Sequence, residues 1–199
     1  MRKINNLVIL VIAGIVATSI AILFIEEPDK IKHQYSDWQI KKTAHEKTLT
    51  KKQIYLLLHR PVTISVNRYY KDFNCSKEDL KLSLVALICL ETGNLQSKTM
   101  QINNLIGMKA VEDRPSFTFM TNEFINGEMN IYKQNFASFY SFEDCTNNFF
   151  KLLTKERYNN VHKAKNYKEF VKKLAKAGYA TDPDYAEKVL RIIKNIKNN

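Results

Sequence analysis

The feature of this sequence that most constrains its fold is an uninterrupted apolar run, Leu84–Leu90, inside the segment Leu80–Gly93. A helix through this run has no polar face, so it has to lie in the middle of a core. Ser76, with Asp79 three residues later, matches a capping box and predicts where the helix begins. Gly93 predicts where it ends, because glycine readily takes the left-handed conformation that closes a helix. The sequence therefore predicts a buried central helix.

One acidic residue, Glu91, follows the apolar run in the last turn of this helix. The negative end of the helix dipole and the apolar neighbours Ile88 and Leu90 disfavour its ionised form, so we expect its pKa to be raised. A carboxylic acid that stays protonated near neutral pH is what a glycosidase uses to protonate a leaving oxygen. The alternative is a glutamate that simply reaches solvent at a helix end, because perturbed carboxylates mark sites only statistically.

The length and composition suit one domain with an appendage. The chain has 199 residues, of which 45% are hydrophobic and 11% aromatic, which is enough for a real core. Its formal net charge of +11 favours a polyanionic partner such as a cell-wall polymer, an anionic membrane or a nucleic acid. The lysines are dispersed and no nucleic-acid-binding motif accompanies them, so we expect no nucleic-acid partner.

The cysteines and histidines predict neither a disulfide framework nor a metal site. The 3 cysteines cannot pair completely, and none has C-x-x-C spacing. Cys89 and Cys145 fall at apolar helix positions, where a buried free thiol is the usual role. The 4 histidines are scattered along the chain, without the spacing of metal ligands. We therefore expect no metal and no cofactor.

The N-terminal apolar stretch, residues 7–25, predicts a transmembrane helix. It contains 19 uncharged residues, about 28 Å of helix, which is close to the hydrocarbon thickness of a bilayer. Arg2 and Lys3 precede it and acidic residues follow it, so the positive-inside rule places residues 1–6 in the cytoplasm and the remainder outside. A cleaved signal peptide is the alternative, but the apolar run continues beyond the small residues at 17–21 where cleavage would fall. We expect a single-pass membrane protein that contacts the lipid bilayer through residues 7–25.

Residues 26–53 are polar and rich in lysine, and Pro28 interrupts them. We interpret them as a juxtamembrane stalk, and residues 54–199 as the folded domain. Within the domain, the alternation over Phe117–Phe124 and the turn pair Asn126-Gly127 predict a β-hairpin with a return strand at 128–133.

Further helices are expected up to Leu58, over 62–73, and after each of three N-cap residues: Ser141, Asn166 and Asp182. The predicted fold class is therefore mainly α with a small β-hairpin lobe.

An acid at a helix end facing a small β lobe resembles the lysozyme-like (α+β) arrangement. Ordered motifs make the resemblance more specific: L-E-T-G-N-L-Q-S at 90–97, N-N-L-I-G-M-K at 103–109, T-N-E-F-I-N-G at 121–127, F-A-S-F-Y-S-F-E-D-C at 136–145, R-Y at 157–158 and A-G-Y-A-T-D-P-D-Y-A at 177–186. Together they resemble the bacterial peptidoglycan glucosaminidases of glycoside hydrolase family 73, the group of flagellar rod-assembly hydrolases and autolysins. The resemblance runs from about residue 74 to the C-terminus.

The resemblance implies metal-free hydrolysis of the β-1,4 bond after N-acetylglucosamine in peptidoglycan glycan strands. By motif it implies that Glu91 is the general acid, Glu123 the second carboxylate and Tyr179 a residue that positions the sugar. For Glu123 the alternative is an ordinary glutamate on a strand surface. The mechanism, whether inverting, retaining or substrate-assisted, stays open.

Four further residues are candidates for substrate binding: Asn94, Asn104, Phe124 and Tyr158. For Tyr158 and Tyr179 the alternative is core packing with a hydrogen-bonded hydroxyl, which we favour for Tyr158. The chain departs from the family pattern after the acid, where the usual S-G-W-G is replaced by T-G-N-L at 92–95. The missing tryptophan would re-shape one sugar subsite without removing the acid.

Three hypotheses for the function follow. The first is a membrane-anchored peptidoglycan glucosaminidase of the bacterial cytoplasmic membrane, with its catalytic domain periplasmic or extracellular. An envelope-spanning complex is a further partner that this placement would allow. The second is a lysozyme or lytic transglycosylase acting on the same polymer. The third is a catalytically idle module that binds the wall or acts as a scaffold.

Overall fold

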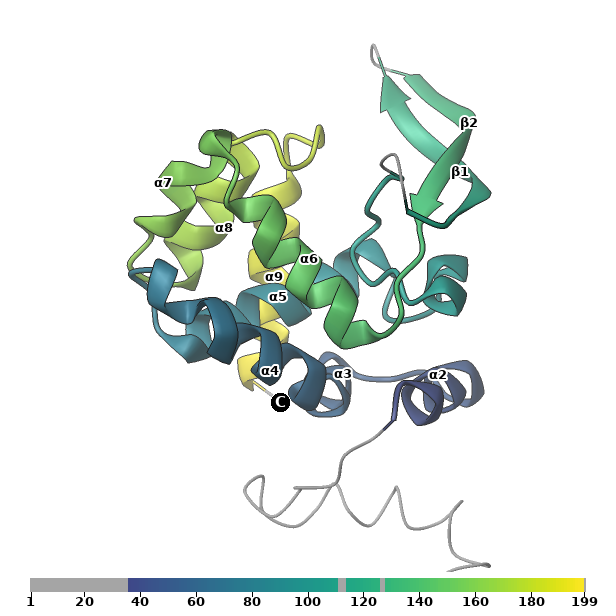
Figure 1. The fold of residues 1–199 in the computed structure, drawn as a ribbon, viewed down its shortest axis with the longest axis horizontal. Helices are drawn as coiled ribbons and strands as arrows, with labels where there is room; N and C mark the ends of the chain where they lie inside the picture. The colour runs from purple at the N-terminus through teal and green to yellow at the C-terminus, as the bar shows by residue number, and fades with distance from the viewer. Residues whose placement is uncertain (1–35, 111–113, 126–127, 199) are drawn as a thin grey trace, which may run out of the picture. The chain divides into compact units, whose positions relative to one another are not determined.

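A computed structural model describes residues 36–110, 114–125 and 128–198 of the chain (Figure 1). These residues belong to a single unit, Tyr35–Asn199. The predicted cytoplasmic residues 1–6, the predicted transmembrane helix at 7–25 and the first part of the predicted stalk lie outside the described residues. None of the helices within the described part combines the length and the apolar character needed to cross a bilayer.

The described residues are mostly helical, with one two-stranded antiparallel sheet. This confirms the predicted fold class of a mainly α domain with a small β-hairpin lobe. The helices are α2 (Asp37–Glu46), α3 (Lys51–Leu57), α4 (His59–Tyr69), α5 (Lys77–Glu91), α6 (Phe142–Leu153), α7 (Asn159–His162), α8 (Tyr167–Lys176) and α9 (Tyr185–Asn198), with short 3-10 turns η1 (Tyr70–Asp72), η2 (Lys98–Ile102) and η3 (Glu156–Tyr158). The strands are β1 (Ser116–Ile125) and β2 (Glu128–Ala137).

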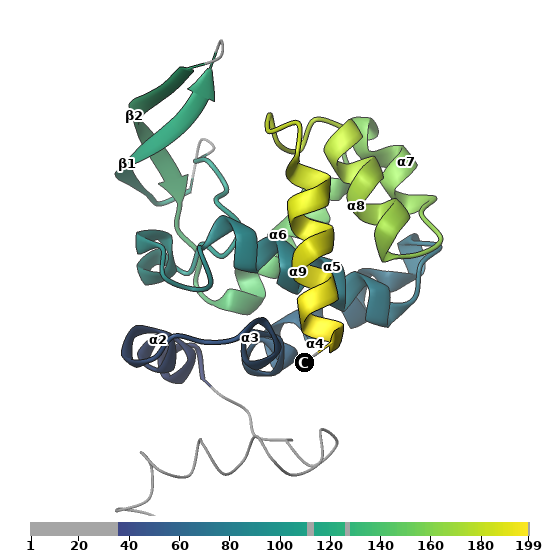
Figure 2. The ribbon, with the colours of Figure 1, turned by 180° about the vertical axis from the view of Figure 1, so that it is seen from behind.

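Helix α5 is the buried centre that the apolar run predicts. Its N-terminus is capped by Ser76, whose Oγ accepts a hydrogen bond from the Asp79 backbone N–H at 3.1 Å. All residues from Leu82 to Cys89 are buried. Helix α5 packs against α3, α4, α8 and α9, and Figure 2 shows α9 passing in front of it. This enclosure explains why the helix needs no polar face.

Helix α5 ends at Glu91 and is closed by Gly93, as predicted. Gly93 has φ +55°, and the two hydrogen bonds of a Schellman motif follow: Asn94 N–H to the Cys89 carbonyl at 2.8 Å and Gly93 N–H to the Leu90 carbonyl at 3.3 Å. The chain therefore turns away immediately after Glu91 and leaves that residue at the end of the helix.

The β-hairpin projects from the helices (Figure 1) and pairs Ser116 with Ala137 at its base. The return strand extends to residue 137, four residues beyond the prediction. The extension follows from tertiary contacts at the base, where Phe136 and Ala137 are buried and the Ala110 N–H donates to the Asn135 carbonyl at 2.8 Å. The predicted turn at 126–127 lies outside the described residues.

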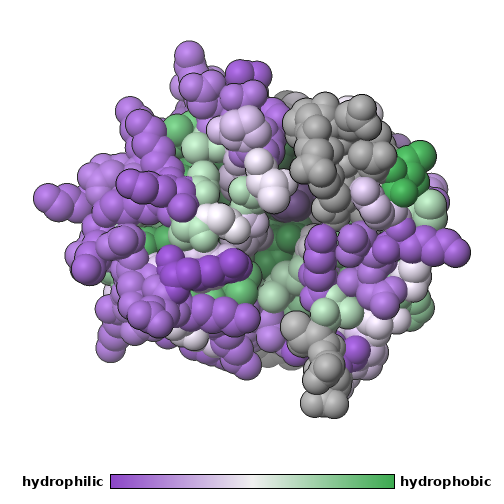
Figure 3. All heavy atoms as spheres, turned by 90° about the horizontal axis from the view of Figure 1, so that it is seen from above, coloured by the Kyte–Doolittle hydropathy of each residue, from purple (hydrophilic) through white to green (hydrophobic). Residues whose placement is uncertain are grey.

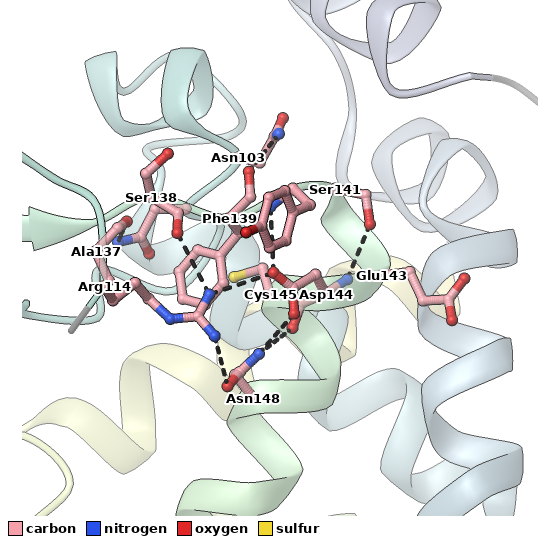
Figure 4. A network of polar contacts seen from close by, with 12 residues as sticks. Asn103, Arg114, Ala137, Ser138, Phe139, Ser141, Glu143, Asp144, Cys145 and Asn148 are labelled. Atoms are coloured by element: carbon pink, nitrogen blue, oxygen red, sulfur yellow. Dashed lines mark hydrogen bonds and ion pairs between the residues drawn. The ribbon is translucent and has the colours of Figure 1, made fainter. Parts of the chain in front are cut away.

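The base of the hairpin is joined to α6 by Arg114 (Figure 4). The guanidinium of this residue donates to Asp144 Oδ2 at 3.2 Å and to Asn148 Oδ1 at 3.3 Å, both on α6. It also donates to the Ser138 carbonyl at 3.3 Å and lies 4.7 Å from the centroid of the Phe139 ring. One side chain thus connects both ends of the hairpin to the helical body.

The structure differs from the prediction that residues 26–53 form a stalk. Helix α2 lies within that range and packs onto the domain, with Ile40 and Ala44 buried. Its first residue, Asp37, accepts a hydrogen bond from the Phe142 backbone N–H at the start of α6, at 2.9 Å. Two apolar residues four positions apart are enough to dock a short helix, although the surrounding lysines make the segment resemble a spacer.

Two predicted helix starts are confirmed and one is shifted. Ser141 and Asn166 cap α6 and α8, and each accepts a hydrogen bond from the backbone N–H three residues later, both at 3.0 Å. Helix α9 begins at Tyr185 rather than directly after Asp182, because Asp182 caps a turn instead, accepting from the Asp184 N–H at 2.9 Å.

Candidate active site

Glu91, at the last position of α5, lies where three other parts of the chain meet. The Tyr185 hydroxyl, from the first turn of α9, donates a hydrogen bond to Glu91 Oε1 at 2.8 Å. On the other side, a Cβ placed on Gly107 would lie 3.4 Å from Glu91 Oε2. Figure 3 views the molecule from the side of the hairpin and the α8–α9 connection, and shows a hollow with apolar residues at its base. Oε1 of the carboxyl group is therefore hydrogen-bonded, whereas Oε2 lies close to the backbone of a residue without a side chain.

The environment of Glu91 favours its protonated form. Burial raises the pKa of the carboxyl group above its usual value, and the hydrogen bond from Tyr185 offsets this increase only in part. Among the described residues no lysine, arginine or histidine forms an ion pair with Glu91. The direction of the pKa shift agrees with the one expected from the apolar neighbours of Glu91, and burial is its main cause.

Tyr179 lies beside this carboxyl group, in the connection between α8 and α9. Gly178, at φ +75°, closes α8, and the Tyr179 N–H donates to the Leu174 carbonyl at 3.3 Å, so the chain reverses at this point. The Tyr179 ring is tilted against Tyr185, with 5.8 Å between centroids, and meets Phe149 edge-on. Burial, followed by the negative charge of Glu91, raises the pKa of Tyr179 well above its usual value. Its phenol therefore remains a neutral hydrogen-bonding group.

Tyr185 is the member of the site that sequence analysis missed. Its spacing with Val189 and Ile193 is that of a core residue on one face of α9, and it is indeed 3% exposed. Its hydroxyl, however, is committed to Glu91. Burial also raises the pKa of Tyr185, which keeps it a donor. The signal available in the sequence was its place in the A-G-Y-A-T-D-P-D-Y-A motif, eight residues from the start of that motif.

Asn104 differs from its predicted role in substrate binding. It is 0% exposed, and its amide is fully used within the chain. The Nδ2 group donates to the carbonyls of Met108 and Ala137 at 2.8 and 2.9 Å, and Oδ1 accepts from the Met108 N–H at 3.0 Å. These bonds shape the loop that contains Gly107 and attach it to the end of β2. Asn104 therefore positions the loop beside Glu91 and has no group left for a sugar.

Tyr158 also differs from its predicted role in substrate binding, in favour of the packing alternative. It is 0% exposed, its hydroxyl accepts a hydrogen bond from the Arg157 guanidinium, and that guanidinium lies 4.5 Å from the ring centroid. A side chain enclosed in this way cannot contact a polymer. The aromatic motif that suggested a cleft residue marks a core residue instead.

The remaining predicted residues are placed only in part. Asn94 is half-buried at φ +65°, and its side-chain oxygen accepts a hydrogen bond from Lys51 Nζ. Glu123 and Phe124 lie in β1, opposite Asn130 and Met129, and their side chains are outside the described part of the structure. Their predicted roles therefore stay predictions.

The described residues contain no group of three or more histidine, cysteine, aspartate or glutamate side chains that could hold a metal ion. The three cysteines are free and buried.

Comparison with known proteins identifies the fold and the family. The family described as mannosyl-glycoprotein endo-beta-N-acetylglucosaminidase matches residues 75–198. Exo-glucosaminidase LytG of Bacillus subtilis (strain 168) is 33% identical over 98 residues, which are 46% of this chain and 35% of that protein. The chain therefore spans about a third of the length of this relative.

Two solved structures share the fold. A C-terminally truncated glycoside hydrolase domain of Salmonella typhimurium FlgJ superposes with a TM-score of 0.55 at 25% identity, over 75% of this chain and 99% of that one. The catalytic domain of the autolysin Auto from Listeria monocytogenes gives a TM-score of 0.60 at 22% identity, over 83% of this chain and 97% of that one. The family match includes Glu91, Tyr179 and Tyr185, and on this ground the chain belongs to the glucosaminidase family of glycoside hydrolases.

Proposed function

We propose that this chain is a peptidoglycan hydrolase that cleaves the β-1,4 bond after N-acetylglucosamine in the wall glycan, with Glu91 as general acid. The observation that carries the proposal is the half-buried carboxyl group of Glu91, which accepts a hydrogen bond from the Tyr185 hydroxyl, has a pKa raised by burial, and forms no ion pair within the described residues. The family supports it, and so do two relatives, an exo-glucosaminidase and the peptidoglycan hydrolase FlgJ.

The two oxygens of Glu91 have different roles in this proposal. Oε1 accepts the hydrogen bond from Tyr185, so the proton to be donated is on Oε2, the oxygen nearer Gly107. When the glycosidic oxygen takes this proton, the carboxylate that remains keeps the Tyr185 hydrogen bond. A hydrogen bond to a charged acceptor is stronger than one to a neutral acceptor, so this bond stabilises the product of proton transfer more than the starting acid.

Glu123 is the second carboxylate in this proposal, and Tyr179 positions the sugar next to the two. The support for Glu123 is its place in the hairpin motif and in β1. The separation of the two carboxylates would distinguish a retaining from an inverting reaction. Asn94 and Phe124 are proposed sugar contacts on the same motif grounds.

Membrane anchoring is part of the proposal. Residues 7–25 have the length and apolar character of a transmembrane helix, with the positive residues on the N-terminal side. In this proposal the catalytic domain lies outside the cytoplasmic membrane of a bacterium, on the same side as the wall glycan. Since α2 is docked on the domain, the proposed spacer does not include residues 37–46.

The test is a digest of purified peptidoglycan followed by mass spectrometry of the fragments. We expect fragments with N-acetylglucosamine at the reducing end, and their loss in Glu91→Gln. Glu156→Gln, an exposed change on η3, is the matched control and should digest as the parent does. Anhydro-muramic ends would assign the chain to lytic transglycosylases instead, and no digestion by a folded parent would leave a wall-binding module.

A further inference from the structure

The exposed side of α8 has a row of like charges. Lys168, Lys172 and Lys176 are spaced four residues apart, so they lie along one side of the helix. All three are exposed. The segment 163–176 contains 6 lysines and 1 acidic residue. We call Lys168, Lys172 and Lys176 the lysine row.

No acidic side chain of the described structure neutralises the lysine row. The one acid of α8, Glu169, already forms an ion pair with Lys173 at 3.4 Å and accepts from the Lys165 backbone N–H at 3.1 Å. Like charges at four-residue spacing repel one another, and the helix dipole favours only Lys176, which lies in the last turn of α8. An external anion would offset this repulsion.

The row also lies on a broader positive surface. Helix α8 packs against α9, where Arg191 and Lys194 are exposed, and Lys197 lies 5.0 Å from the Tyr167 ring centroid at the start of α8. Figure 3 shows hydrophilic residues over the side of the molecule where α7 and α8 lie in Figure 1. At its other end the row leads to the site, because Tyr179 follows Lys176 by three residues.

We propose that the lysine row binds a linear polyanion with a phosphodiester in each repeat, attached to the bacterial wall, and thereby holds the enzyme next to its glycan substrate. Neighbouring lysines of the row are about 6 Å apart along the helix axis, so an extended chain of phosphates can meet them in succession. The inference rests on the proposed function, because it is the wall glycan that brings such a polymer close to Tyr179 and Glu91.

Binding measured without hydrolysis tests this proposal. The full chain carrying Glu91→Gln is sedimented with purified walls that retain their phosphodiester polymer, and with the same walls stripped of it by hydrofluoric acid. We expect binding to the intact walls to weaken roughly 20-fold between about 50 and 200 mM salt, as for three phosphate contacts, and to be weak on stripped walls. The variant Lys168→Gln/Lys172→Gln/Lys176→Gln should lose about tenfold or more in affinity for intact walls.

Two matched variants separate the row from bulk charge. Lys47→Gln/Lys71→Gln/Lys98→Gln removes the same charge from exposed positions outside α8 and should bind as the parent does. Replacing the three row lysines by arginine keeps the charge and should keep the binding. Equal loss in the Lys47/Lys71/Lys98 variant would overturn the proposal, as would equal binding of the parent to stripped walls.

Two further probes settle the partner and the link to catalysis. If the Lys168→Gln/Lys172→Gln/Lys176→Gln variant loses affinity for anionic lipid vesicles or duplex DNA but not for intact walls, the wall polyanion is not the partner of the lysine row. In the active protein, which retains Glu91, the substitution of the three row lysines by glutamine should leave the digestion of stripped walls unchanged. A chain that binds intact walls through the row but digests nothing would retain this inference and refute the proposed hydrolysis.

Discussion

The Tyr185 hydroxyl and the Glu91 carboxyl group, 94 residues apart in the sequence, form a hydrogen bond of 2.8 Å at the junction of α9 and α5. The bond opposes the effect of burial on Glu91, since it is the one influence that lowers a pKa that desolvation raises. It also orients the acid, because it fixes which oxygen is left for the substrate. These two effects can be measured separately.

Removing the hydroxyl with Tyr185→Phe should raise the pKa of Glu91 further, because only desolvation then acts on it. The rate of hydrolysis falls when Glu91 loses its proton, so the alkaline limb of the pH–rate profile should move to higher pH. The maximal rate should fall by about tenfold to a hundredfold, the value of one hydrogen bond to a charged group. An alkaline limb that stays in place or moves to lower pH would contradict the assignment of Tyr185.

Glu91→Gln should make the protein more stable at high pH while it abolishes activity. A carboxyl group whose folded pKa is raised binds more protons in the folded state, so it makes stability decline as pH rises from the unfolded pKa to the folded one. The amide has no such decline, and it can still accept the Tyr185 hydrogen bond. Each unit of raised pKa corresponds to about 1.4 kcal/mol.

Urea unfolding of the parent and of Glu91→Gln at acidic and at neutral to alkaline pH measures this difference. The two curves should coincide at acid pH, below the ordinary pKa of glutamate, and separate above it in favour of the variant. A parent that is the more stable of the two at alkaline pH would mean that Glu91 has a charged partner after all.

Gly107→Ala should damage catalysis beyond its effect on folding. At φ +63° an alanine is strained, and its Cβ would lie 3.4 Å from Glu91 Oε2, the oxygen from which the proposed mechanism donates its proton. Gly93→Ala is the matched control: its φ of +55° gives the same strain, and its Cβ meets no atom within 4 Å. Both should lose about 1–2 kcal/mol of stability, but only Gly107→Ala should also lose most of its activity under conditions where it is folded. Equal activities of the two variants would exclude a close approach of substrate to Oε2.

The parts of the fold that sequence predicts are those with a local cause. The apolar run between the cap residues Ser76 and Gly93 predicts that α5 is a buried helix. The N-cap residues Ser141 and Asn166 likewise predict where α6 and α8 begin. The hairpin follows from alternation, although its length does not, because the burial of its last residues depends on the helices below it.

The parts that sequence does not predict depend on distant partners. Asparagine suits both a sugar contact and a loop, and only the positions of the Met108 and Ala137 backbone decide that Asn104 does the second. Tyr185 has the spacing of a core residue and is one, but its hydroxyl has a function because α9 happens to reach Glu91. No local pattern distinguishes these outcomes, since residue type and spacing are the same in both.

Arg114 gives a test of how far the site depends on the attachment of the hairpin. Its hydrogen bonds to Asp144, Asn148 and the Ser138 carbonyl are half-shielded from solvent, with the side chains of Arg114 and Asp144 each 26% exposed (Figure 4). Arg114→Ala should lower the free energy of unfolding by about 2 kcal/mol, the scale for hydrogen bonds that involve a charged group.

The variant should lose more activity than its stability explains, because the hairpin that bears Glu123 is then free to move away from Glu91. Arg68→Ala provides the comparison: Arg68 pairs with Glu143 at 3.5 Å, but it is 53% exposed, so its loss should cost less than about 1 kcal/mol. Digestion of peptidoglycan well below both melting temperatures is the measurement. If Arg114→Ala retains the activity of Arg68→Ala there, the site does not depend on the attachment of the hairpin through Arg114.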